Sequence, residues 1–130
     1  MKCSDFLKFI FTNYTNVTGL ILCQPYEFKK YEKLLYDTFV KKINPFFIRS
    51  YTRQNSVTYN LSSNNCFNLV VYSDSVLCGT RADFVMLSNK NLIKENSLRE
   101  VFYPMIICRR FRTLKPFVYC IGNRKFLTEL

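Results

Sequence analysis

The sequence has no histidine among its 130 residues. A chain without imidazole cannot build a Ser-His-Asp or Cys-His pair, and it lacks the side chain that most often serves as a general base near neutral pH. It also lacks the nitrogen ligand of mixed zinc sites. Histidine-dependent catalysis and imidazole-ligated metal centres are therefore excluded.

Glycine is scarce, with only Gly19, Gly79 and Gly122. The loops that cradle nucleotide phosphates, G-x-x-x-x-G-K-[ST] and G-x-G-x-x-G, need closely spaced glycines and a backbone that approaches the phosphate. Isolated glycines cannot supply them. We expect no nucleotide cofactor.

Closely spaced cysteine pairs are also missing, although the chain has six cysteines. Without a C-x-x-C pair or a histidine, no ordinary zinc site can form. Several cysteines fall inside apolar runs, where a reduced thiol behaves as a small hydrophobic group: Cys23, Cys66, Cys108 and Cys120. We expect free thiols and an intracellular protein of the host cytoplasm or nucleus, with a disulfide framework as the alternative.

No hydrophobic run reaches the roughly 18 residues that a membrane span needs. The first residues, MKCSDFLKFIFTNYT, resemble a signal peptide, but Asp5 and Lys8 interrupt the apolar run and no small-residue cleavage site follows. No membrane association is expected.

Acidic residues are few: nine face 19 lysines and arginines, for a net charge of +10. Such a surplus attracts polyanions, of which nucleic acid is the commonest. An acidic protein or an anionic lipid surface are the other candidates, and solubility alone is the competing explanation. Frequent Asn, Lys, Phe, Tyr and Ile are typical of AT-rich genomes and point to a virus or a parasite.

Two helices are predicted in the first third of the chain, the first capped by Ser4. Pro25 suits the start of the second, which runs to Ile43 with apolar residues at helical spacing. A third helix is expected with Asn96 or Ser97 as its cap, and Ser97 and Glu100 have the spacing of a capping box. Pro104 makes this helix short, kinked or broken into two.

Six strands are predicted from apolar or alternating runs: Val17–Cys23, Phe46–Thr52, Ser56–Leu61, Cys66–Ser73, Asp83–Ser88 and Pro116–Gly122. The residues after Gly122 are expected to fray. Together these elements predict a single α/β (or α+β) domain over residues 1–130, a layered mixed sheet with two or three helices.

Catalytic candidates are weak. Asp74 and Asp83 flank the central turn, but a two-metal nuclease centre needs about three converging acids, so a metal-dependent nuclease stays a minor alternative. Cys78, beside Gly79, lacks a neighbouring base, and an ordinary turn cysteine is the simpler interpretation. We expect no enzyme, no catalytic residue and no metal.

The stretch LVVYSDSVLCGTRADFVMLSNKN, from Leu69 to Asn91, resembles a segment of the large terminases, the viral DNA-packaging ATPases. There, an R-G-x-x-A-D-like turn precedes a buried strand that ends in the Walker B acids. Cys78–Asp83 looks like that turn, and Phe84–Leu87 looks like that strand. The order of the flanking elements is similar over about residues 4 to 123.

Two departures limit what this resemblance implies. Ser88 and Asn89 stand where the Walker B acids are expected, and neither can hold Mg²⁺ as a carboxylate would. The phosphate-binding loop is missing. The resemblance therefore implies a degenerate ATPase fold, with no catalytic residue carried over.

The leading hypothesis is a small basic, non-enzymatic viral protein that binds nucleic acid. Guanidiniums contact phosphates, and an aromatic ring between them can stack on a base. The predicted contacts are Arg109, Arg110, Phe111, Arg112, Lys115, Arg124 and Lys125, with a second patch at Lys29, Lys30 and Lys33.

The alternative is a protein-interaction module that binds a host or viral partner, or a second copy. Tyrosine and arginine are enriched at interfaces, and an edge strand can pair with another chain. Candidate exposed residues are Tyr26, Tyr51, Tyr59, Tyr72 and Arg53.

Overall fold

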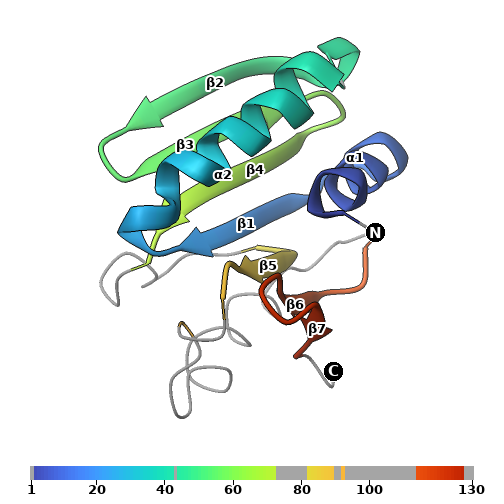
Figure 1. Ribbon diagram of the computed structural model, residues 1–130. Coiled ribbons are helices and arrows are strands. Elements are labelled where there is room, and N and C mark those ends of the chain that lie inside the picture. The colour runs from blue at the N-terminus through green and yellow to red at the C-terminus, as the bar shows by residue number, and fades with distance from the viewer. Residues whose placement is uncertain (1, 43, 73–81, 90–91, 93–113, 128–130) are drawn as a thin grey trace.

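The computed structural model describes residues 2–42, 44–72, 82–89, 92 and 114–127. They form one seven-stranded sheet in the order β2-β3-β4-β1-β5-β6-β7 (Figure 1). Both helices pack on the same face of this sheet. The predicted α/β class, with a mixed sheet and two helices, is confirmed.

The centre of the sheet is parallel. β1 (Thr18–Cys23) pairs in parallel with β4 (Asn65–Val71) on one side and with β5 (Phe84–Leu87) on the other. β6 (Phe117–Cys120) extends the parallel set beside β5. β1 and β5 are uninterrupted apolar runs because both of their faces are covered, as expected for central parallel strands.

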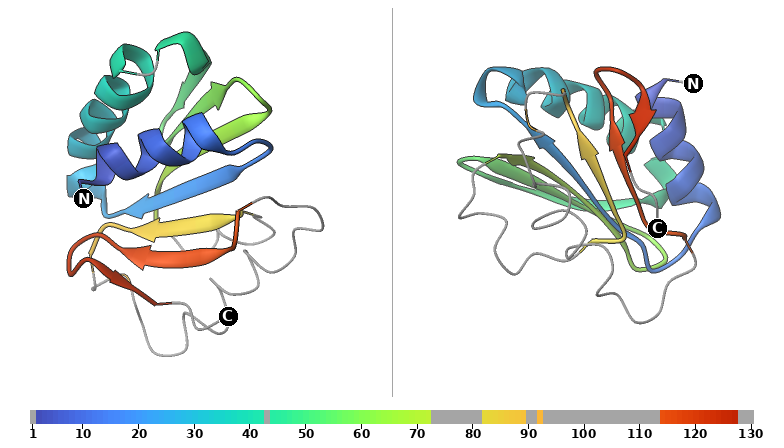
Figure 2. Two further views of the ribbon diagram at one scale, coloured as in Figure 1. Left: turned by 90° about the vertical axis from the view of Figure 1, so that its right-hand side faces the viewer. Right: turned by 90° about the horizontal axis from the view of Figure 1, so that it is seen from below.

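The two flanks of the sheet are antiparallel. β2 (Phe47–Arg53) pairs with β3 (Ser56–Leu61), which pairs with β4, so that β2 forms one edge. β7 (Lys125–Phe126) folds back on β6 and forms the other edge (Figure 2). The expectation that the chain frays after Gly122 is thus wrong for Lys125 and Phe126, which a hairpin holds.

The helices cover the sheet with an aromatic core. α1 (Cys3–Asn13) buries Leu7, Ile10 and Phe11, and Phe11 makes edge-on contacts with the rings of Phe39 and Phe67, at centroid distances of 5.6 and 5.7 Å. Such T-shaped pairs add to the burial of apolar area. α1 begins at Cys3 with Lys2 at the N-cap, and the predicted cap at Ser4 lies inside the helix.

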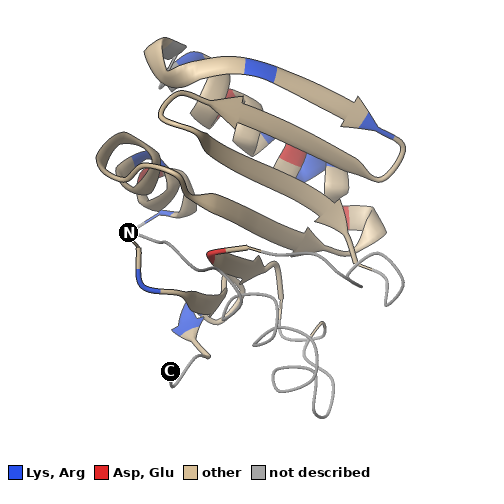
Figure 3. Cartoon of the chain, turned by 180° about the vertical axis from the view of Figure 1, so that it is seen from behind, with Lys and Arg blue, Asp and Glu red and all other residues tan. Residues whose placement is uncertain are grey.

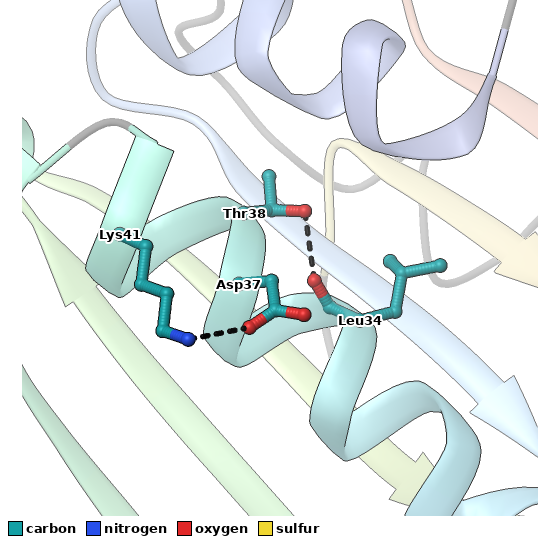
Figure 4. A network of polar contacts seen from close by, with 4 residues as sticks. All are labelled: Leu34, Asp37, Thr38 and Lys41. Carbon is teal, nitrogen blue, oxygen red and sulfur yellow. Dashed lines mark hydrogen bonds and ion pairs between the residues drawn. The ribbon is translucent and has the colours of Figure 1, made fainter.

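The predicted helix from Pro25 is present in three consecutive parts. A 3₁₀ turn, η1 (Pro25–Glu27), leads into α2 (Phe28–Leu35), which continues as a π-helical segment, η2 (Tyr36–Lys42). Another 3₁₀ turn, η3 (Asn44–Phe46), joins it to β2. In η2 the Thr38 hydroxyl donates to the Leu34 carbonyl at 2.8 Å, and Lys41 pairs with Asp37 at 3.5 Å (Figure 4).

The opposite face of the sheet has a smaller apolar cluster around β1, β5 and β6, which includes Leu20, Val85 and Val118. Tyr59, predicted to be exposed, points to the helix side and is only 2% exposed. This correction follows from register, because Tyr59 lies opposite the buried Phe67. No helix in the described part of the chain is both long and apolar enough to cross a membrane.

Candidate functional site

A cleft of about 760 Å³ opens at the carboxyl ends of β5 and β6. In open sheets of parallel strands, ligands bind at this edge, outside the strand ends. The start of α1 and one side of α2 form its walls, and the β6–β7 hairpin contributes the rest. Its lining residues are Lys2, Cys3, Ser4, Phe6, Glu27, Lys30, Tyr31, Leu34, Met86, Ser88, Tyr119, Ile121, Gly122, Arg124 and Phe126.

Positive charge dominates this cleft. Lys2 comes from the start of α1, Lys30 from α2 and Arg124 from the turn before β7, and all three are exposed. Glu27 is the one acid among the described lining residues. The cleft therefore favours an anion, and its cations come from three separate parts of the chain.

Glu27 is held by donors from the chain itself. Its Oε1 accepts hydrogen bonds from Ser88 Oγ at 2.6 Å, from Asn89 Nδ2 at 3.1 Å and from the backbone N–H of Gln24 at 3.1 Å. These bonds tie the carboxyl end of β1 to that of β5. The carboxylate closes the capping box of η1 instead of projecting freely into the cleft.

The raised pKa values of two thiols near this edge, Cys3 and Cys23, keep them protonated near neutral pH. Burial raises the pKa of Cys3, which lines the cleft, from 9.0 to about 11. Burial, and after it the charge of Glu27, raises the pKa of Cys23 to about 12. Cys3, Cys23, Cys66 and Cys120 are all free thiols. Because the thiolate is the nucleophile, neither Cys3 nor Cys23 is activated.

Asp83, one of the two acids considered for a nuclease centre, stabilises the fold where the structure places it. It is fully buried, and its Oδ2 accepts a hydrogen bond from the backbone N–H of Thr18 at 2.7 Å. It lies before β5, at the opposite end of that strand from the cleft. Asp74, its proposed companion, lies outside the described residues. Within the described residues, no three Cys, Asp or Glu side chains gather as a metal site would require.

The predicted nucleic-acid contacts are partly brought together. Lys30, from the predicted helix patch, and Arg124, from the C-terminal patch, line the same cleft, although 94 positions separate them in the sequence. Lys29 and Lys33 are exposed on α2, and Lys115 and Lys125 are exposed near β6 and β7. Arg109, Arg110, Phe111 and Arg112 lie outside the described residues.

The sequence prediction missed Lys2. Its signal in the sequence was slight, a single cation at the start of a predicted helix. Its importance comes from the fold, which places Lys2 in the lining of the same cleft as Lys30 and Arg124. Of the predicted exposed tyrosines, Tyr26 and Tyr51 are exposed and Tyr72 is half-buried.

The arrangement of these elements matches two solved viral structures. The large terminase ATPase domain of a Thermus phage superposes with a TM-score of 0.59 and 14% identity, over 96% of this chain and 55% of that one. The large terminase of a thermophilic bacteriophage, in complex with ADP, gives a TM-score of 0.55 and 9% identity, over 90% of this chain and 28% of that one. What is shared is the fold.

The resemblance expected from the sequence is thus confirmed at the level of topology. This chain spans only part of each matched protein, about half of the first. No protein-family model matches the sequence, and neither does any curated protein. Ser88 and Asn89, which stand where the terminase resemblance places the Walker B acids, follow β5 at the edge of the cleft and bind the Glu27 carboxylate.

Proposed function

We propose that this chain is a small, basic, non-enzymatic viral protein that associates with nucleic acid on a degenerate terminase-like ATPase fold. One observation carries the proposal: Lys2, Lys30 and Arg124 converge on a single cleft in which Glu27 is already bound by the chain's own donors. Three cations against one carboxylate among the described lining residues leave a net positive charge, which suits the phosphates of a polyanion. The free thiols among the described residues support an intracellular location as a further part of this proposal.

The same proposal includes the absence of ATP hydrolysis. ATP hydrolysis on this kind of fold relies on carboxylates that hold Mg²⁺ and orient water. Here the hydroxyl of Ser88 and the amide of Asn89 act as hydrogen-bond donors to Glu27. We therefore expect no ATP hydrolysis by the purified chain, measured as phosphate release with Mg²⁺ present.

Salt-titrated binding to single-stranded and duplex DNA tests the nucleic-acid association. Affinity is expected to fall steeply as salt rises, because each neutralised phosphate releases counterions. The double variant Lys30→Ala and Arg124→Ala should make the negative slope of log K against log salt less steep, by about 0.7 to 0.9 for each cation removed.

The matched control is Lys8→Ala, which removes one charge from an exposed position on α1 that does not line the cleft. It should leave the slope unchanged. A flat salt response of the native chain, or no binding to any DNA or RNA, would refute the proposal.

A protein-interaction module remains the second candidate because β2 is an exposed edge strand. Ile48 and Tyr51 on it are 61% and 44% exposed, as an interface strand would be. Charge reversal at Lys30 and Arg124 separates the two functions. It should abolish nucleic-acid binding through the cleft and leave a partner complex formed through β2 intact.

A further inference from the structure

The three antiparallel strands β2, β3 and β4 have a mainly polar face on the side of the sheet opposite the helices, where Cys66 and the partly buried Val70 also lie. The register between β2 and β3 determines which residues lie on this face. Arg49, Tyr51 and Arg53 lie opposite Asn60, Thr58 and Ser56 of β3, and paired residues point to the same side of a sheet. The alternate residues of β3, such as Val57 and Tyr59, point into the aromatic core under the helices. We call the outward-facing set Arg49, Tyr51, Arg53, Ser56, Thr58, Asn60 and Asn68 the meander face.

This face is basic, and none of the residues in its three strands is acidic. The sequence contains no Asp or Glu from Thr38 to Ser73, a span that includes all three strands. Arg49 and Arg53 are exposed, and their Cα atoms are separated by roughly 13 Å, the length of four residues along a strand. Figure 3 views the sheet from this side, with both cations on the outermost strand and the helices behind the sheet.

An aromatic ring lies between the two cations. Tyr51 is 44% exposed, and the Arg49 guanidinium lies over its ring at 5.0 Å from the centroid. Stacking on arginine fixes the ring and leaves it available as a platform. Beside it, the Thr58 hydroxyl donates to Asn68 Oδ1 at 2.8 Å, which orients the Asn68 amide on the same face.

We propose that the meander face binds single-stranded nucleic acid, with one base stacked at Tyr51 and phosphates held by Arg49 and Arg53. The chemistry favours a single strand because unpaired bases expose the π-faces that an aromatic platform on an open sheet can stack, whereas a duplex hides them. An acidic peptide would engage the arginines but would leave the ring without a role. The inference rests on the proposed function and assigns it a second surface, apart from the cleft.

The test is fluorescence anisotropy of the full chain with a labelled oligothymidine and with a duplex of equal length. Tyr51→Ala should weaken binding of the single strand by about tenfold, in the range found when a stacked base loses its ring, while Tyr51→Phe keeps the affinity. Arg49→Ala and Arg53→Ala should each make the slope of log K against log salt for the single strand less steep, by about 0.7.

Two controls make the comparison specific. Thr52→Ala changes a neighbouring exposed residue that register places on the helix side, and Lys8→Ala removes one charge from α1. Both should bind the oligothymidine as the native chain does. Equal urea midpoints across the set confirm that these surface substitutions leave the fold intact.

The outcomes separate this inference from the broader proposal. If the native chain binds no nucleic acid, the proposed function fails, and the meander face fails with it. If the chain binds but Tyr51→Ala and the arginine variants match Lys8→Ala, binding occurs elsewhere and only the meander face is refuted. Displacement of the oligonucleotide by an acidic peptide, with Tyr51→Ala neutral, would also overturn it in favour of a protein ligand.

Discussion

At the scale of single residues, Glu27 is the side chain on which the cleft edge depends. Its Oε1 is the common acceptor for Ser88, Asn89 and the Gln24 N–H. Glu27→Ala leaves these donors without that acceptor and should lower the free energy of unfolding by about 2 kcal/mol, measured by urea titration. Glu27→Gln keeps an oxygen acceptor and should cost clearly less. Equal losses in the two variants would show that the hydrogen bonds do not stabilise the fold.

The same residue also sets the charge of the cleft. Glu27→Gln removes the one acid among the described lining residues while Lys2, Lys30 and Arg124 remain. If the cleft receives phosphates, this variant should bind single-stranded DNA more tightly than the native chain at low salt, and the gain should shrink as salt rises. Unchanged affinity at low salt would place the bound phosphates away from Glu27.

The raised pKa values of buried thiols and of a buried tyrosine predict how the stability of the fold depends on pH. Burial raises the pKa of Cys3 to about 11, that of Cys23 to about 12 and that of Tyr59 from 10.0 to about 12. Each folded pKa exceeds its unfolded value, so the unfolded chain loses protons first as pH rises. The stabilisation is complete below about pH 9 and disappears towards pH 12. Urea unfolding from pH 7 to 11 should show stability falling above pH 9, and Cys23→Ala should reduce that fall.

At the scale of elements, the pattern of apolar residues predicted the strands and the first two helices well where each pattern had one interpretation. The third predicted helix, near Ser97, lies outside the described residues and stays a prediction. The long runs Thr18–Cys23 and Phe84–Leu87 fill buried central strands, and alternation in Ser56–Leu61 matches a strand with one covered face. β7 was missed because a two-residue strand carries no periodicity. Tyr59 was misplaced because the prediction judged its residue type without its register.

One element-scale prediction concerns how closely β1 and β5 pack. A Cβ on Gly19 would lie 2.6 Å from Phe84 Cε1 and 2.8 Å from Phe67 Cδ1. Phe84 is stacked on Phe117 at 4.9 Å, so the ring has little room to move away. Gly19→Ala should therefore cost about 1 to 3 kcal/mol by overpacking. Urea unfolding beside the exposed control Thr52→Ala checks this, and a loss no larger than the control's would contradict it.

At the scale of the whole molecule, the candidate site could not be predicted because it depends on strand order. The sequence indicates two basic patches but not that the turn after β6 lies near the start of α1, so that Arg124 lines the same cleft as Lys2 and Lys30. β5 lies between β1 and β6, so residues from the beginning, middle and end of the chain meet at one edge. Charge composition predicts an anionic ligand, which stays a prediction, whereas the cleft could be located only from the topology.

The order of strands in the sheet also predicts where the molecule unfolds locally. β1 is paired on both sides and buried, whereas β2 is an exposed edge strand whose outer backbone groups face no strand of this sheet. Amide hydrogen exchange should be slowest in β1 and in the β4 and β5 amides bonded to it. The outward-facing amides of β2 should exchange fastest among the strands. If β2 is instead protected from exchange as strongly as β1 and loses that protection on dilution, a second copy of the chain covers this edge. Binding to the meander face would then have to be measured on the dissociated protein.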